Sequence, residues 1–445
     1  MSPEIITILA LVVIFAIATF LPINMGALAF VAAFVVGTLS VGLTTDEIIG
    51  GFPAGLVLTL IGVTYLFAIA QNNGTVDLLV RGAVKLVGGH VAAIPWIMFF
   101  VTAVLTAIGA LSPAAVAIIA PIALTFAARH GISPLLMGMM VIHGAQGGGF
   151  SPISVYGVTV NTIVEDEGLP SSPLAVFLGA LFFNIAIAVV LFFVLGGRKL
   201  IGRKVDARAE VPAEAAHAPR TEVQGHGAAP GPAVGGDDPE HPDRPQPVRF
   251  EQILTLIGLV VVAVLALAFD LDIGFVAITV AVVLALFSAK QHKGAVSQIS
   301  WSTVLLIAGV LTFVSVLEAA GTIDYVGDAV IGLGVPLLIA LLLAYIGGVV
   351  SAFASSTAII GVAILLAVPF LEAGEISAVG VVVALSVAST IVDVSPFSTN
   401  GALVLAAAQD VDKDRFYKQI LGYAAIVVAA GPFLAWLVFV VPGWL

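Results

Sequence analysis

The side chains that could do chemistry in this chain gather in two polar interruptions of otherwise apolar sequence. The first, at residues 142–161, reads IHGAQGGGFSPISVYGVTVN, and the second, at residues 391–401, reads IVDVSPFSTNG. Clustered glycines weaken a helix, and a proline removes a backbone donor and crowds the preceding turn. Each interruption therefore predicts a broken helix. Two broken membrane helices at matching places in two halves indicate a transporter's binding site.

Two smaller polar clusters divide longer apolar stretches. One stretch, residues 91–127, is interrupted at Ser112-Pro113, and the other, residues 336–367, is interrupted at Ser355-Ser356-Thr357. Each arm is short for a full crossing and the middle is polar. We therefore expect two re-entrant hairpins whose tips stop at membrane depth.

The polar groups at these tips and breaks suit a cation and a carboxylate. Apart from Lys418 at the first position of the last predicted span, no lysine or arginine lies inside any predicted span or hairpin. Hydroxyls, an amide and freed backbone carbonyls suit a hard cation such as Na⁺, and the positive ends of half-helices suit a carboxylate. An anion that meets no basic side chain is costly to desolvate. Co-bound cations offset that cost, which favours symport with Na⁺ if the substrate is an anion.

The candidate residues come from both tips and both breaks. The predicted substrate contacts are Ser112, Gly148, Gly149, Ser151, Ser154, Ser356, Thr357, Ser398, Thr399 and Asn400. The predicted ligands of Na⁺, or carriers of a coupling proton, are Ser112, Ser151, Ser355, Thr357, Asp393 and Ser395. A single serine or threonine in a membrane helix more often serves helix packing. The duplication of the clusters between the halves favours a site.

Asp393 is the strongest candidate among the titratable groups. An intramembrane carboxylate is expensive enough to be functional by default, and the alternative is a capped acid that holds the break open. His143 faces the first break and is equally a packing residue or a ligand. We expect structural roles for Asn184 and for Glu318, whose counterpart in the first half is the neutral Gln71.

Composition predicts a helical membrane protein with many spans. Of 445 residues, 60% are hydrophobic and 10% are charged, which leaves too little polar surface for a soluble globule. The formal net charge of -11 is spread through loops, so we expect no nucleic-acid partner. The chain has no cysteine, which excludes disulfides and thiolate metal sites. Residues 4–20 are interpreted as a retained span rather than a signal peptide.

Apolar runs predict two sets of five spans. The runs lie at residues 4–20, 25–43, 51–71, 134–162 (broken), 172–196, 250–268, 272–288, 301–319, 376–408 (broken) and 418–441. If the loop after residue 196 is cytoplasmic, all 16 lysines and arginines lie inside, as the positive-inside rule requires. Five crossings per half then predict inverted halves, 1–196 and 250–445, with both termini outside the cytoplasmic membrane.

Three local patterns support this organisation. QNNGTVD at residues 71–77 is similar to EAAGTID at residues 318–324, at the end of the third span of each half. Asp77, Arg81 and Lys85 share one helical face, which predicts an interfacial amphipathic helix. Residues 197–249 form the predicted disordered cytoplasmic linker, because 205–248 contain no aromatic residue and are rich in proline, alanine, glycine and charge.

These segments resemble the ion transporter superfamily, and within it the divalent-anion symporters and the bacterial dicarboxylate carriers of the malonate type. The resemblance rests on MFFVTAVLTAIGALSPAAVAIIAPIAL, GAQGGGFSPISVYGVTVN, SAFASSTAIIGVAILLAVP and ASTIVDVSPFSTNGALVL. It implies a homodimer in which a scaffold part holds the dimer and a transport part moves substrate with Na⁺ by an elevator mechanism. The symporters carry Ser-Asn-Thr at both tips, whereas this chain has Ser112-Pro113-Ala114 and Ser355-Ser356-Thr357.

The sequence thus predicts an all-α carrier that imports a small carboxylate, such as a C3 or C4 dicarboxylate, with Na⁺ in a bacterial inner membrane. The same fold driven by protons through Asp393 is the near alternative, and an anion channel is a more distant one. We expect no enzyme, because the chain lacks a metal-spaced histidine pair, twin aspartates and a Ser/Lys dyad at depth.

Overall fold

The computed structural model describes most of the chain outside the central linker. The described residues are 2–21, 23–85, 90–204, 248–269, 271–288, 293–323, 325, 335–352, 356–372, 374, 376–408 and 411–445. Of the predicted disordered linker, residues 205–247 lie outside this description, and their disorder stays a prediction. The prediction is wrong for residues 197–204, which form a 3-10 turn (Gly197–Leu200) and a bridge between Lys204 and His90.

Within the described residues the fold is helical, with one isolated bridge between His90 and Lys204 and no named strand. The first half contains α1 (Pro3–Phe20), α2 (Met25–Val36), the π-helix η1 (Gly37–Val41), α3 (Thr45–Gly50), α4 (Ala54–Asn72), α5 (Thr75–Lys85), α6 (Ala93–Ala107), α7 (Ser112–His130), α8 (Pro134–Gly148), α9 (Val155–Asp166), α10 (Pro173–Val194) and the 3-10 turn η2 (Gly197–Leu200).

The second half repeats much of this order. It contains α11 (Phe250–Ala268), α12 (Ile273–Phe287), the 3-10 turn η4 (Ala295–Gln298), α13 (Trp301–Ala319), α15 (Pro336–Ser351), α16 (Ser356–Leu365), α17 (Val368–Glu372), α18 (Ala378–Ile391), α19 (Thr399–Ala407) and α20 (Lys413–Phe439).

The helix bounds agree closely with the apolar runs. Both expected breaks are present, between α8 and α9 and between α18 and α19, and both apolar hairpins are helix pairs, α6–α7 and α15–α16. Five described helices are long and apolar enough to cross a membrane: α4, α7, α10, α13 and α20. We expected each hairpin arm to be too short to cross the membrane. This is wrong for α7, whose 19 residues are long enough to span a membrane.

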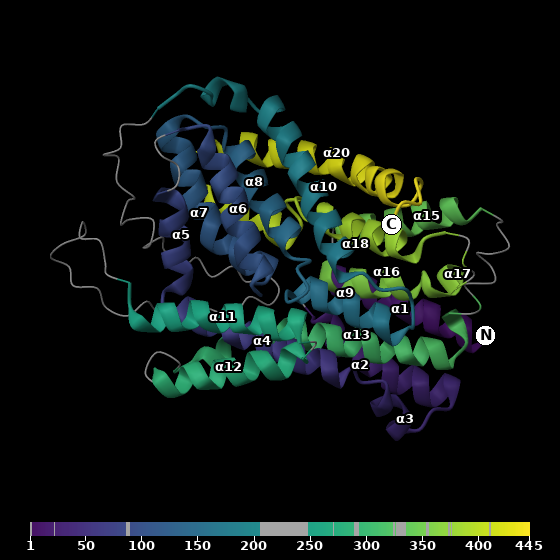
Figure 1. The fold of residues 1–445 in the computed structure, drawn as a ribbon. Helices are drawn as coiled ribbons and strands as arrows, with labels where there is room; N and C mark the ends of the chain where they lie inside the picture. Colours follow the sequence, from purple (N-terminus) through teal and green to yellow (C-terminus); the bar gives the residue numbers. More distant parts are fainter. Residues whose placement is uncertain are drawn as a thin grey trace.

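The helices form two groups side by side (Figure 1). One group contains α1–α4 with α11–α13, and the other contains α6–α10 with α15–α20. The first group is held across the two halves by glycines: a Cβ on Gly26 of α2 would lie 2.0 Å from the Leu305 carbonyl oxygen of α13, and one on Gly62 of α4 would lie 2.6 Å from that of Gly274 in α12. Small residues thus allow close backbone packing between the halves.

The second group contains the breaks and hairpins, and its contacts also cross between halves. Helix α7 of the first hairpin packs on α19 behind the second break, and α16 of the second hairpin packs on α9 behind the first break. Each break therefore lies beside a hairpin of the other half.

Candidate substrate and ion site

The first break is closed by its own backbone and by Ser154. Helix α8 ends at Gly148 and α9 begins at Val155. The Ser154 hydroxyl contacts the carbonyl oxygens of Gly149 and Ser151, the latter at 2.7 Å, and accepts the Gly157 N–H at 3.3 Å. This side chain caps α9 and satisfies carbonyls that the broken helix leaves free.

The second break has the same geometry 244 residues later. The Ser398 hydroxyl contacts the carbonyl oxygens of Asp393 at 2.8 Å and Ser395 at 2.7 Å, and it accepts the Gly401 N–H at 3.4 Å. A Cβ on Gly157 or on Gly401 would lie 1.9 or 2.0 Å from the carbonyl oxygen of Ser151 or Ser395. Two of the predicted substrate-contact serines, Ser154 and Ser398, therefore stabilise the breaks themselves.

A buried hydrogen-bonded cluster joins the second break to the first hairpin. The Asn400 Nδ2 donates to the Ser112 Oγ and to the Asp393 Oδ2, both at 2.8 Å. Asn400 is fully buried, and Ser112 and Asp393 are 3% and 6% exposed. The structure thus brings together three predicted site residues from α7, α19 and the break itself; we name Ser112, Asp393 and Asn400 the amide cluster.

The amide cluster leaves one oxygen without a donor. The Asn400 Oδ1 is buried and has no hydrogen-bond partner in the described part of the chain. Because the Asn400 Nδ2 faces the Asp393 carboxylate, the Asn400 Oδ1 faces another direction, and its lone pairs accept no hydrogen bond from the described residues. An unpaired buried carbonyl is costly, and a hard cation is one partner that would satisfy it.

The first break has a polar network of a different kind. His143 of α8 hydrogen-bonds through Nδ1 to the Asn184 Oδ1 at 2.9 Å and through Nε2 to the Tyr423 hydroxyl at 2.6 Å. Asn184 also donates to the Ala180 carbonyl at 2.9 Å. Asn184, expected to be structural, is therefore the partner of His143, and together they tie α8 to α10 and α20.

Gln146 is a buried residue that the sequence reasoning missed. It lies between His143 and the first break, is 0% exposed, and neither amide atom has a hydrogen-bond partner among the described residues. Its signal in the sequence was an uncharged amide within the polar run 142–161.

The two glycines predicted as substrate contacts are packing positions. A Cβ on Gly148 would lie 1.9 Å from the Ala103 carbonyl oxygen of α6, and one on Gly149 would lie 3.0 Å from the Tyr156 ring. Both are buried. This packing explains why glycine stands there, and a substrate role for either residue stays a prediction.

The remaining candidates are dispersed. Ser151 is buried at the first break, and the Ser395 Oγ accepts the Phe397 N–H at 3.2 Å. Thr399 is exposed, away from the buried amide cluster, so the structure does not bring it to the site. The Ser351 hydroxyl donates to the Ser356 Oγ at 2.9 Å, and the same Ser351 hydroxyl contacts the Ser389 carbonyl oxygen. These bonds hold the second tip to α15 and α18.

The rest of the second tip falls outside what the structure describes. Ser355 is not among the described residues, and only the backbone of Thr357 is described, at the start of α16. Among the described side chains, no hydrogen bond joins the second tip to the amide cluster.

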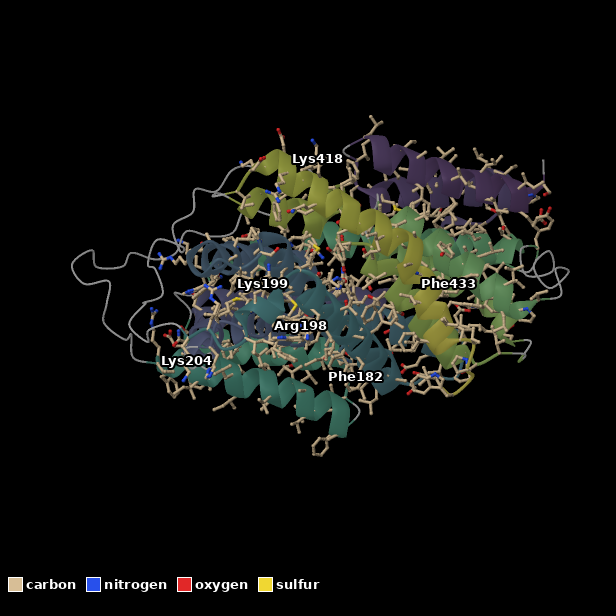
Figure 2. All side chains as sticks on the ribbon, turned by 90° about the horizontal axis from the view of Figure 1, so that it is seen from above. Phe182, Arg198, Lys199, Lys204, Lys418 and Phe433 are labelled. Atoms are coloured by element: carbon tan, nitrogen blue, oxygen red, sulfur yellow. The ribbon has the colours of Figure 1, made fainter. Side chains whose placement is uncertain are left out.

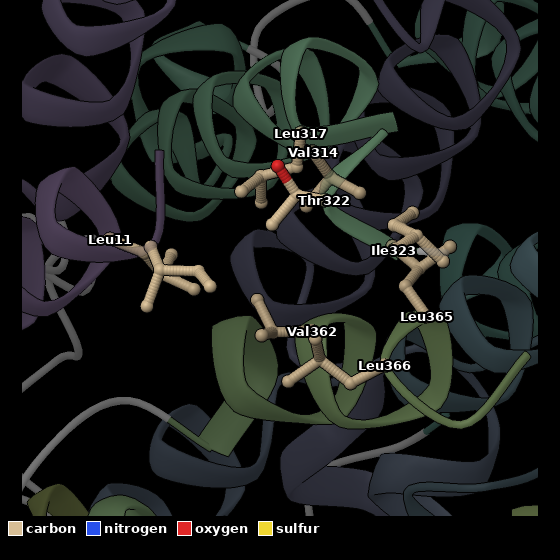
Figure 3. A pocket seen from close by; sticks show the side chains of 9 residues that line it. Leu11, Val314, Leu317, Thr322, Ile323, Val362, Leu365 and Leu366 are labelled. Atoms are coloured by element: carbon tan, nitrogen blue, oxygen red, sulfur yellow. The ribbon is translucent and has the colours of Figure 1, made fainter. Parts of the chain in front are cut away.

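A separate crevice between α1, α13 and α16 is apolar (Figure 3). Its lining includes Leu11, Val314, Val362 and Leu366. Thr322, the one polar residue of this lining, hydrogen-bonds the Thr7 hydroxyl at 2.6 Å. The crevice offers no groups for a carboxylate, so the amide cluster remains the better candidate site.

Several acidic residues lie around the C-terminal end of α9. Partial burial raises the pKa of Glu167, and the neighbouring charges of Glu318, Asp166 and Glu372 raise it further. Glu318 therefore lies near Glu167 rather than at a break, and its structural role stays a prediction.

The N-terminal third of the chain is similar to a known protein family. Residues 1–149 match the family described as the N-terminus of dicarboxylate carrier protein MatC. This part of the chain is similar to the N-terminal region of dicarboxylate carriers of the MatC family. The MatC match runs from α1 through α8 and confirms the resemblance to dicarboxylate carriers that the sequence predicts. It ends at the first break, so Asp393 and Asn400 lie outside it.

A solved structure extends the likeness to the whole fold. The YdaH transporter of Alcanivorax borkumensis is similar with a TM-score of 0.59 and 14% identity over 98% of each chain. No curated protein sequence matches significantly. The MatC family and the YdaH transporter are transport proteins rather than enzymes, as expected. The chain is an all-α, multi-pass membrane protein.

Proposed function

We propose that this protein carries a small carboxylate, a C3 or C4 dicarboxylate, across the cytoplasmic membrane together with Na⁺. The MatC match and the YdaH fold support a carboxylate carrier. The observation that carries the proposal is the amide cluster, in which Asn400 joins the first hairpin to the carboxylate of the second break.

The donor set of the amide cluster favours a cation beside the substrate. Asp393 supplies a carboxylate, Asn400 an unpaired carbonyl oxygen and Ser112 a hydroxyl, and oxygen ligands are those that hard cations prefer. The sequence between residues 131 and 197, and between 336 and 408, contains no lysine or arginine. A bound cation supplies the positive charge that a substrate carboxylate needs there.

The proposed movement is an elevator built from two inverted repeats. Its support is the one-to-one correspondence of helix contacts: α7 on α19 matches α16 on α9, and α2 on α13 matches α12 on α4. The group that contains the breaks would move against the group of α1–α4 and α11–α13. A homodimer held by the latter group, with both termini outside, completes the proposal.

Uptake into proteoliposomes tests this function. Purified protein is reconstituted and offered radiolabelled malonate or succinate under an inward Na⁺ gradient or an inward proton gradient. Accumulation driven by Na⁺ alone supports the proposal. Accumulation driven by protons alone would mean that protons, carried by Asp393, replace Na⁺ as the coupling ion. If neither gradient drives accumulation, the proposed substrate class is wrong.

The proton-coupled alternative rests on the same carboxylate. Asp393 is buried in the second break with an amide as its neutral partner. Replacing Asp393 with asparagine separates the two forms of coupling. The proton carrier loses coupled accumulation, whereas the Na⁺ carrier loses mainly its affinity for Na⁺.

A further inference from the structure

A short segment after α10 holds both ends of the first hairpin. We name residues 197–204 the clamp. The Val91 N–H at the start of α6 donates to the Arg203 carbonyl at 3.1 Å, and His90 pairs with Lys204 in an antiparallel bridge. The Arg203 Nη2 donates to the His130 carbonyl at 2.9 Å at the end of α7. The clamp thus fixes the two arms of the hairpin whose tip carries Ser112.

The clamp is strongly basic. Arg198, Lys199 and Lys204 are exposed, and none of them forms an ion pair within the described residues. Residues 90–164 and 168–204 contain no aspartate or glutamate. No carboxylate from the hairpin, from α8 or from α10 therefore neutralises these cations.

The clamp also continues the apolar outer face of α10. That face is strongly exposed at Phe182, Val190, Phe193 and Val194, and the Arg198 guanidinium lies 5.9 Å from the Phe193 ring centre. Figure 2 labels Phe182 together with Arg198, Lys199 and Lys204. In a membrane, acyl chains cover such a face, and the headgroup at their end meets the basic side chains.

We propose that the clamp binds the headgroup of an anionic phospholipid whose acyl chains lie along α10. Phosphate oxygens accept from the guanidinium of Arg198 and the ammonium of Lys199, and the lipid's net negative charge selects it over a zwitterionic lipid. A bound headgroup screens the repulsion between the clamp's cations and so tightens its hold on the first hairpin. This lipid site is separate from the amide cluster.

Lipid binding to the full chain tests the site. The purified protein is titrated with phosphatidylglycerol or phosphatidylcholine, and bound lipid is counted by native mass spectrometry. The double variant Arg198→Gln/Lys199→Gln should bind phosphatidylglycerol about 30-fold more weakly, because each basic residue near an anionic surface contributes about 1 kcal/mol. The control Lys413→Gln/Lys418→Gln removes the same charge from α20, and its affinity should stay within about twofold of the wild type.

A second readout reports the clamp itself. Phosphatidylglycerol should slow hydrogen exchange of the Val91 amide in the wild type and in Arg198→Lys, which keeps its charge, but not in the double variant. If the clamp and control variants lost equal affinity for phosphatidylglycerol, binding would reflect general attraction to cytoplasmic positive charge, and the proposal would be wrong. Equal binding of both lipids, or displacement of the lipid by millimolar inorganic phosphate, would overturn it as well. None of these readouts requires transport.

Discussion

The two breaks share a backbone but not a chemistry. In each, a serine contacts the carbonyls five and three residues before it and accepts an N–H from a glycine three residues after it. At the offset of 244 residues, Gly149 and Tyr156 of the first break correspond to Asp393 and Asn400 of the second. The first pair is a packing contact, whereas the second is a carboxylate–amide hydrogen bond.

This difference distinguishes the groups that shape both breaks from the groups that we propose bind the coupling cation. The serine cap and the closely packed glycine occur in both breaks, so they belong to the shared geometry of the bend. Asp393 and Asn400 occur only in the second, where they reach the first hairpin through Ser112. Of the two similar breaks, only the second therefore contains a buried acidic side chain.

Replacing Asn400 with alanine should have the largest effect on transport. The change leaves the buried Asp393 carboxylate without its amide donor and cuts the link to Ser112, so uptake should fall about 10- to 100-fold. The matched control is Tyr156→Phe in the first break, which keeps the ring packing and should change uptake by less than about threefold. Similar losses in both variants would mean that the breaks are chemically equivalent.

The two close-packed glycines should be equally intolerant of a side chain. Gly157→Ala and Gly401→Ala each force a Cβ against a backbone carbonyl, which should destabilise the fold by about 1–3 kcal/mol. Thermal unfolding in detergent measures the effect. Gly422→Ala in α20, where a Cβ meets nothing within 4 Å, serves as the control and should not lower the melting temperature. A tolerated alanine at either break would contradict the shared geometry.

Loss of either serine cap should cost less, and equally in both breaks. Ser154→Ala and Ser398→Ala each remove an N-cap, which contributes about 1 kcal/mol. Unfolding temperatures of the two variants should fall by similar amounts, while Ser171→Ala at an exposed loop position should leave the temperature unchanged. A much larger loss of uptake than of stability in Ser398→Ala would restore the predicted substrate contact of that serine.

The smallest expected effect concerns Glu167, outside both breaks. Its folded-state pKa is raised above the ordinary value of 4.5, first by burial and then by Glu318, Asp166 and Glu372. The folded state therefore holds this proton more tightly, and wild-type stability falls as pH rises from about 4.5 through the raised pKa. Glu167→Gln should be more stable than the wild type above that range and no more stable below it. Parallel stability curves between pH 4 and 8 would refute this linkage.

Sequence reasoning located the helices and their interruptions well. The span expected at 301–319 coincides with α13, and both breaks lie where glycine, serine and proline cluster. These are local effects, because helix propensity and apolar run length act over a few turns. Helix α7 is longer than expected because it begins at Ser112, with Pro113 tolerated in its first turn, and continues to His130, beyond the predicted end of the apolar stretch at residue 127.

The site itself depended on contacts that no local pattern contains. Ser112, Asp393 and Asn400 were each candidates, but the bond between residues 288 positions apart follows from the packing of α7 on α19. Asn184 looked isolated in sequence because its partner His143 lies on another helix. Thr399 looked equivalent to Asn400, yet adjacent helix positions face different directions, and only Asn400 is buried.

Direct binding of radioactive ²²Na⁺ to the purified protein tests the central claim, that the amide cluster holds the coupling cation. The wild type should bind Na⁺ at equilibrium, malonate should tighten that binding, and Asp393→Asn should weaken it at least about tenfold while Tyr156→Phe leaves it unchanged. Unaltered Na⁺ affinity in a folded Asp393→Asn variant would contradict the account and place the coupling ion elsewhere in the chain.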